Sequence, residues 1–136
     1  MTITRRRAAQ TLGAIRLVNG AAALFTPKLM IRLLRVDPDA HPQMIYFMKM
    51  FGIRTILLGV QLFSLEGEDL DRAMRTGILI HASDTAAAAV AGITGQLPKR
   101  AAMSGTAIST LNTVLAVYGS GLIGNPGAIS ELLGAV

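Results

Sequence analysis

The stretch GIRTILLGVQLF, residues 52–63, largely decides how this chain is expected to fold. It is mostly apolar, and its two glycines, Gly52 and Gly59, stand seven residues apart. Seven residues return to nearly the same face of an α-helix, and small residues on one face let a neighbouring helix approach closely. The stretch therefore predicts a helix that packs through its glycines.

The stretch GAIRLVNGAAALF, residues 13–25, repeats this layout. Gly13 and Gly20 also stand seven residues apart, and an arginine follows the first glycine in both stretches. Arg16 comes three residues after its glycine, whereas Arg54 comes two residues after its own. The two arginines therefore lie at different angles from the glycine faces, which argues against an internal duplication.

Apolar residues around these stretches form four segments long enough to cross a membrane, at about residues 8–25, 44–65, 73–97 and 101–123. At about 1.5 Å per residue, even the shortest covers about 27 Å, close to the thickness of a bilayer's hydrocarbon core. Proline, glycine and charged residues mark the short connections, which imply antiparallel neighbours. The predicted fold is all-α: one membrane domain over residues 1–136, an antiparallel bundle of four transmembrane helices. An alanine-rich soluble bundle is the alternative.

The break between the first two segments contains a short element of its own. Thr26 and Pro27 suit the N-cap and first position of a helix, which predicts an interfacial helix over about residues 27–36. Its three cations, Lys28, Arg32 and Arg35, share one face of this helix. The opposite face consists of leucines and a methionine. An amphipathic helix of this kind lies among lipid headgroups, so these cations are the predicted headgroup contacts. A surface helix without lipid contact is the alternative.

The net charge of +5 points to an anionic partner. The basic residues flank apolar segments, as in TRRRAAQ (residues 4–10) and LPKRAAM (residues 97–103), which is where membrane proteins place them. The chain has no tryptophan and few aromatic residues to stack on bases, so nucleic acid is excluded as a partner. The lack of cysteine excludes disulfides, thiolate nucleophiles and Cys-ligated metals. Membrane lipids are the expected partners.

The N-terminal residues have the basic start and apolar run of a signal peptide. Arg16 and Asn19 interrupt that run, and a removable signal has no use for a charge at this depth. We therefore expect an uncleaved, multi-pass protein of the bacterial cell membrane.

Each predicted span contains at least one polar residue of a kind that is rare in membranes. The set consists of Arg16, Asn19, Arg54, His81, Asp84 and Asn112. A charge at the centre of a span costs about 2.5–3.5 kcal/mol on insertion scales, so these residues are expected to face other helices. Asp84 is the only carboxylate deep in a predicted span, so charge balance predicts that it pairs with Arg16 or Arg54. Because two arginines face one aspartate, one positive charge remains. An anionic headgroup, water or a substrate oxygen would interact with it.

Two interpretations of this polar set stay open. In the structural one, the set fixes the register and pairing of the helices. In the functional one, His81 and Asp84 of GILIHASDTAAAAVAG (residues 77–92) act as general acid and base, because a spacing of three places them on one side of a helix. The other members would then bind a substrate in a polar pocket, namely Arg16, Asn19, Arg54 and Asn112.

Two sharper chemistries are excluded by position. Ser83 lies two residues from His81, which turns it about 160° away on a helix, so these two residues and Asp84 form no Ser-His-Asp triad. The chain has two histidines, and His41 falls in a proline-flanked loop, far from the span that holds His81. We therefore expect no metal site and no cofactor.

The order of these motifs resembles a group of small actinobacterial four-helix integral membrane proteins of unknown function. The motifs are LGAIRLVNGAAALFTPKL (residues 12–29), FGIRTILLG (residues 51–59) and the His-x-x-Asp of residues 81–84, and the resemblance covers most of residues 8–120. The group commonly has Gly-x-Arg-Asp in its second span, where this chain has Thr55 in place of the acid, and an acidic pair in its third. The resemblance implies the four-helix topology and the importance of Arg54 and Asp84, and it supplies no reaction.

Two functions are compatible with these features. The first is a small multi-pass membrane protein that acts by helix association, as a homo-oligomer or as a subunit of an envelope-lipid complex, or that holds a lipophilic ligand. The alternative is a small membrane-embedded enzyme, of the isomerase, cyclase or epoxide-opening type, that performs acid/base chemistry on a hydrophobic substrate in the pocket of arginine, histidine and aspartate. The residues alone leave open whether the protein is an enzyme.

Overall fold

The computed structural model describes residues 3–122 of the chain. This range contains five α-helices and no strand: α1 (Ile3–Phe25), α2 (Pro27–Leu33), α3 (Gln43–Ser64), α4 (Gly67–Ile93) and α5 (Lys99–Ser120). The predicted all-α class is therefore confirmed. Residue 123, the end of the fourth predicted span, lies outside the described residues.

α4 begins earlier in the chain than the apolar pattern indicated. It starts at Gly67 rather than near residue 73 and includes the acidic residues that were expected in the loop. Glu68 and Asp69 fall in its first turn, where carboxylates interact favourably with the positive end of the helix dipole. The connection between α3 and α4 is consequently very short.

α2 turns away from α1 at a proline. Pro27 lies in the first turn of α2, and the chain bends by 106° between α1 and α2. α2 ends at Leu33, before the predicted end at residue 36, and Arg35 follows in the left-handed region with φ of 61°. The prediction that Arg35 shares a helical face with the other two cations is therefore wrong.

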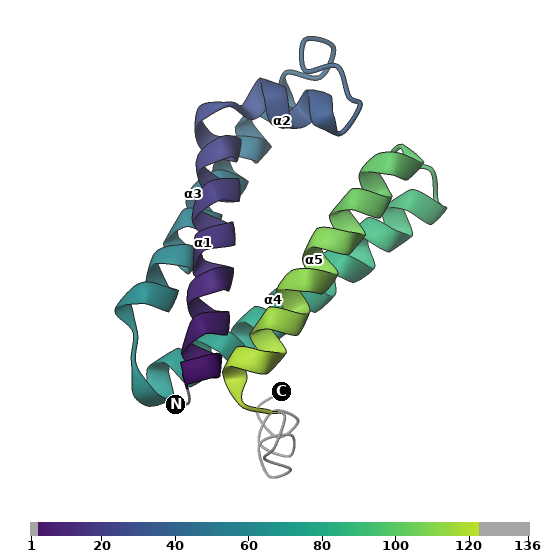
Figure 1. The fold of residues 1–136 in the computed structure, drawn as a ribbon. Helices are drawn as coiled ribbons and strands as arrows, with labels where there is room; N and C mark the ends of the chain where they lie inside the picture. The colour runs from purple at the N-terminus through teal and green to yellow at the C-terminus, as the bar shows by residue number, and fades with distance from the viewer. Residues whose placement is uncertain (1–2, 123–136) are drawn as a thin grey trace.

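The helices form two antiparallel pairs, α1 with α3 and α4 with α5 (Figure 1). The pairs meet at the end where α1 begins and α5 ends, through a core of Ala9, Leu12, Leu62, Leu70, Met74 and Ala116. From this core the pairs spread apart toward α2, so that together they have the outline of a V (Figure 1). A closed bundle would bury the faces between the pairs along their whole length, whereas here a cavity lies between them.

Glycines hold α1 against α3 at very short range. A Cβ added to Gly52 would lie 2.7 Å from the carbonyl oxygen of Gly20, and a Cβ on Gly59 would lie 3.1 Å from the carbonyl oxygen of Gly13. The two glycine faces therefore meet in antiparallel fashion, with each glycine of one helix opposite a glycine of the other. The prediction that these helices pack through their glycines is confirmed.

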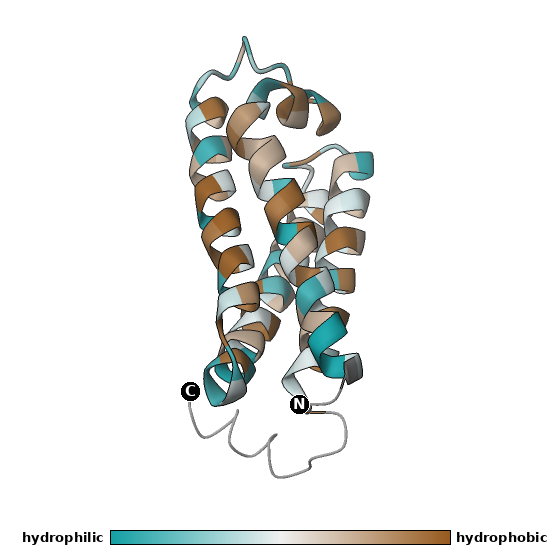
Figure 2. Cartoon of the chain, turned by 60° about the vertical axis from the view of Figure 1, so that its left-hand side comes forward, coloured by the Kyte–Doolittle hydropathy of each residue, from teal (hydrophilic) through white to brown (hydrophobic). Residues whose placement is uncertain are grey.

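Two of the helices, α3 and α4, are long and apolar enough to cross a membrane, and α1 with α2 would count as a third span if the bent pair is one. Apolar residues recur along the length of the helices (Figure 2). Many large apolar side chains are exposed on their outer faces, including Leu57, Phe63 and Ile93. An exposed apolar surface of this extent marks contact with a membrane or with another protein, and it is compatible with the membrane location predicted from the sequence. Among the described helices, α5 does not meet the same test of length and hydropathy, and serine, threonine and asparagine recur along it.

Candidate functional site

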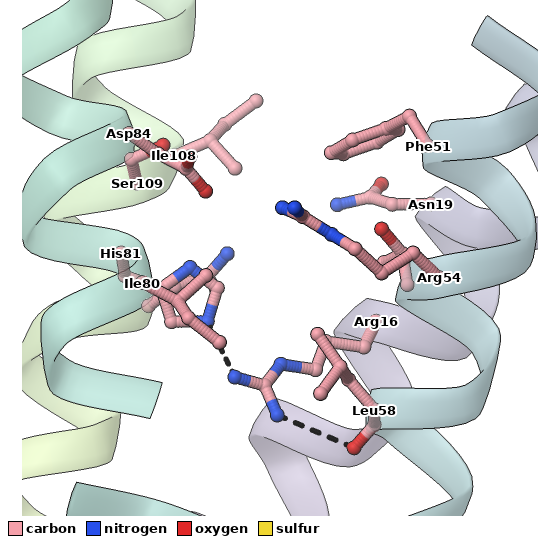
Figure 3. A pocket seen from close by; sticks show the side chains of 12 residues that line it. Arg16, Asn19, Phe51, Arg54, Leu58, Ile80, His81, Asp84, Ile108 and Ser109 are labelled. Atoms are coloured by element: carbon pink, nitrogen blue, oxygen red, sulfur yellow. Dashed lines mark hydrogen bonds between the residues drawn. The ribbon is translucent and has the colours of Figure 1, made fainter. Parts of the chain in front are cut away.

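A cavity of about 170 Å³ lies between the two helix pairs and is lined by all four long helices (Figure 3). Its lining consists of Arg16, Asn19, Phe51, Arg54, Thr55, Leu58, Ile80, His81, Asp84, Ile108, Ser109 and Asn112. The six polar residues singled out in the sequence are all among them. The structure therefore brings the whole predicted polar set to one place.

Arg16 crosses from α1 to the facing pair and contacts His81. Its side chain is buried, with the residue only 3% exposed. Nη2 lies 2.9 Å from His81 Nε2, and Nη1 donates to the carbonyl oxygen of Leu58 at 3.3 Å. Because a guanidinium has donors only, His81 Nε2 must be the acceptor, which leaves the ring proton of a neutral imidazole on Nδ1. Arg16 and His81 thus join the two helix pairs by a hydrogen bond.

Gly77 makes room for this contact. A Cβ added there would lie 3.0 Å from Arg16 Nη2, so a larger residue would press on the guanidinium. Gly77 precedes His81 by four residues and lies on the same face of α4. Gly77 is not among the site residues predicted from the sequence, although a glycine one helical turn before His81 was the available signal.

The prediction that Asp84 forms an ion pair with Arg16 or Arg54 is wrong. In the part of the chain that the structure describes, Asp84 forms no ion pair with Arg16 or Arg54. His81 lies closer to the point where the two helix pairs meet, and Asp84 lies farther along α4, where the pairs have already separated (Figure 3). Arg16 therefore reaches the imidazole, and the carboxylate faces the open cavity.

Arg54 and Asp84 face each other across this cavity. Arg54 extends from α3 into the space, with Asn19 and Phe51 beside it on the same wall (Figure 3). Among the described residues, Arg54 has no hydrogen bond or ion pair, and its side chain is exposed. Two opposite charges thus line opposite walls without touching.

Two buried polar atoms of the cavity lining, Arg16 Nε and Asn112 Oδ1, have no hydrogen-bond partner among residues 3–122. Buried polar groups in folded proteins are nearly always hydrogen-bonded, so each such atom needs an explanation. Both residues are more than nine-tenths buried. The polar set therefore does not satisfy itself, and the cavity retains capacity to bind polar groups.

A second cavity of about 270 Å³ adjoins the first, between α3 and α4. It shares three lining residues with the first cavity, Arg16, Leu58 and Ile80, and it extends to the charged residues Asp69 and Arg72 near the start of α4. Arg16 therefore stands between a cavity in the middle of the helices and one that reaches their polar end.

The predicted headgroup residues lie at the other end of the molecule, on and after α2. Lys28, Arg32 and Arg35 are all exposed. Asp39 from the following loop pairs with two of them, because its Oδ1 lies 2.7 Å from Lys28 Nζ and its Oδ2 lies 3.6 Å from Arg32 Nη2. Contact of these cations with lipid stays a prediction, and two of them already have a carboxylate beside them.

The ion pairs of Asp39 with Lys28 and Arg32 predict a lowered pKa for Asp39. The hydrogen bond from Lys28, together with the positive charges of Lys28 and Arg32, lowers the pKa of Asp39 below its ordinary value of 3.8. A folded-state pKa below the unfolded value means that the stabilisation is present at neutral pH and is lost as the pH falls through the folded pKa. NMR titration of the Asp39 carboxyl carbon should give a midpoint below 3.8 in the parent protein and a higher midpoint in Lys28→Gln, in which only Arg32 remains beside the carboxylate. Equal midpoints in the two proteins would contradict the pairing.

Comparison with protein-family models, with curated proteins and with solved structures gives no match for this chain. Membership of the four-helix group that the sequence resembles therefore stays a prediction. A function has to be argued from the cavity and its surroundings.

Proposed function

We propose that the protein is a small multi-pass membrane protein that holds a lipophilic ligand in the cleft between its two helix pairs. The observation that carries the proposal is the convergence of six polar residues, from all four long helices, on one cavity. Thr55, Ser109 and four large apolar side chains complete its lining, the apolar ones being Phe51, Leu58, Ile80 and Ile108. Sites for small molecules combine apolar walls with polar groups that fix the orientation of the ligand, and this lining offers both.

Membrane insertion of all four long helices is part of this proposal. α1 has 23 residues and α5 has 22, which gives each a length of about 33 Å, enough to cross the hydrocarbon core. Each packs antiparallel to a helix that meets the criteria for a span. α2 would then lie along the membrane surface, with its exposed cations toward anionic headgroups.

Ligand binding accounts for the polar residues better than helix association alone. Polar residues that only fix helix pairing should satisfy one another, since unpaired polar groups in hydrocarbon are costly. Here Arg54 and Asp84 face the cavity, and Arg16 Nε has no hydrogen-bond partner in the described part of the chain. An acid/base enzyme with His81 as the proton acceptor is less well supported, because Arg16 already donates to His81 Nε2.

A bulky side chain introduced into the cavity should prevent the ligand from binding. The parent protein, purified in a mild non-ionic detergent, is expected to carry a lipophile of defined mass in native mass spectrometry. Ser109 lines the cavity, so Ser109→Trp should place an indole in the ligand's space and abolish that adduct. Ser83 is exposed on α4, and Ser83→Trp is the matched control that should keep the adduct.

Two outcomes would contradict the proposal. One is a parent protein that carries no lipophile even after mild extraction, and the other is an adduct that persists equally in both tryptophan variants. Far-ultraviolet circular dichroism of the two variants would show whether the helices are retained.

A further inference from the structure

We infer that the ligand is an amphiphile with a singly charged oxyanion headgroup, a carboxylate or a phosphodiester, bound by Arg54 and Arg16. The hydrocarbon chain of this ligand extends out of the cavity, through the gap between the two helix pairs. The inference rests on the proposed function, a cleft that holds a lipophilic ligand, and adds the charge and shape of the molecule held.

The charges around the cavity set the charge of the ligand. Arg16 and Arg54 are cations, Asp84 is an anion, and His81 accepts a hydrogen bond on Nε2 and so contributes a neutral imidazole. The lining therefore has one positive charge in excess. An uncompensated charge in an apolar interior is unfavourable, so a ligand with one negative charge completes the site.

The guanidinium groups have the donors to bind an oxyanion. Arg54 extends into the cavity without an ion pair among the described residues, and Asn19 lies beside it on the same wall (Figure 3). Arg16 Nε is buried and has no hydrogen-bond partner among the residues that the structure describes. Guanidinium groups match the oxygens of carboxylates and phosphates, often through two parallel hydrogen bonds.

Asp84 limits the ligand to one negative charge. Its carboxylate lies on the wall opposite Arg54 and Asn19, so an oxyanion between the walls is attracted to one side and repelled from the other (Figure 3). A headgroup with two negative charges would bring the second charge toward Asp84, which is unfavourable at short range in low dielectric. The site therefore favours a monoanion over a dianion such as a phosphate monoester.

The size of the cavity favours a headgroup with an external chain. Its volume of about 170 Å³ is below the range of roughly 300–1,000 Å³ that encloses a whole drug-sized ligand. The helix pairs spread apart beyond it, and apolar side chains such as Phe51 and Ile108 lie at its edge (Figures 1 and 3). A chain attached to the headgroup can therefore continue into the gap between the pairs, in contact with lipid.

The inference is tested with four probes of defined chemistry. Oleate has the charge and the chain, oleyl alcohol has the same chain without charge, and acetate has the charge without the chain. Lysophosphatidylglycerol has a chain and one phosphodiester charge. Binding is measured at about pH 8, where carboxylates are ionised, from the chemical shift of ¹³C-carboxyl oleate and by competition with the other probes at constant detergent concentration.

Oleate or lysophosphatidylglycerol is expected to bind at least about tenfold more tightly than oleyl alcohol and acetate. Arg54→Gln should weaken this binding about tenfold or more, whereas Arg100→Gln should not change it. Arg100 is exposed at the start of α5, outside the cavity, so the control removes the same charge elsewhere. Because Arg54 makes no hydrogen bond with a described residue, Arg54→Gln should keep the parent fold and thermal stability.

The outcomes separate the inference from the proposed function. Equal binding of oleate and oleyl alcohol, or unchanged oleate binding by Arg54→Gln, overturns the headgroup assignment and leaves a cleft for neutral lipophiles. If acetate binds as tightly as oleate, the inference that the ligand is an amphiphile is wrong, and the site binds a small anion instead. Failure of every probe with a chain to bind overturns the proposed function itself.

Discussion

Replacing Gly52 by alanine is expected to lower the free energy of unfolding by about 2 kcal/mol. The added Cβ would come within 2.7 Å of the carbonyl oxygen of Gly20 and of the amide nitrogen of Leu24. Both atoms belong to the backbone of α1 and cannot rotate away, so α1 has to move as a whole. This cost outweighs the gain of roughly 1 kcal/mol that alanine has over glycine within a helix.

The matched control is Gly105→Ala in α5. A Cβ at that position would lie 3.5 Å from the Cβ of Ala88, which is an ordinary van der Waals contact. The same substitution should therefore be neutral or stabilise the protein by up to about 1 kcal/mol. Both variants are measured by thermal or denaturant unfolding in one detergent, with circular dichroism as the readout. If the two behave alike, close glycine contact is not what holds α1 to α3.

Replacing Arg16 by methionine is expected to lower the free energy of unfolding by about 2–3 kcal/mol. Methionine fills part of the same space but leaves His81 Nε2 and the Leu58 carbonyl oxygen without the donor that Arg16 supplies. Burying a polar atom without its hydrogen bond costs about 1–3 kcal/mol, and bonds from a charged donor are at the stronger end. Removal of a buried charge offsets part of this loss, so the measurement needs a second variant.

A double-mutant cycle isolates the contact from these side effects. Arg16→Met and His81→Leu, alone and together, should give a coupling free energy of about 1–3 kcal/mol, because each substitution removes the same hydrogen bond. The matching cycle of Arg16→Met with Asp84→Asn should give a smaller coupling, since these two charges interact only at longer range and form no ion pair in the described structure. Larger coupling to Asp84 than to His81 would show that charge balance, and not the observed hydrogen bond, governs this site.

The sequence was sufficient to predict the long helices and the packing of α1 on α3. Length and purity of apolar runs identify the helices, and the spacing of Gly52 and Gly59 predicts which face meets a neighbour. Helix boundaries were less accurate, because the acidic turn at Glu68 can belong to a loop or to a helix start. The left-handed Arg35 that follows α2 has no sequence signal, because arginine rarely adopts that conformation.

The polar set converges on one cavity as expected, but its internal pairing was not predictable. Charge balance selected Asp84 as the partner of an arginine, and it took no account of how far the helix pairs separate along their length. Three residues on α4 correspond to a rise of about 4.5 Å, which is enough to exchange His81 for Asp84 as the residue within reach of Arg16. The angle between two helix pairs depends on their whole interface, so it cannot be predicted from a short sequence motif.

The division into two pairs bears on how the chain is assembled during synthesis. Once residues up to Ser64 have been made, α1 and α3 can already pack along their glycines, and α4 and α5 form the second pair from a later, contiguous part of the chain. Contacts that are local in sequence form quickly, and units made first tend to fold first. The cleft, by contrast, needs residues from both pairs, and it is complete only when Arg16 meets His81. The proposed ligand site is therefore expected to be the last part of the molecule to form.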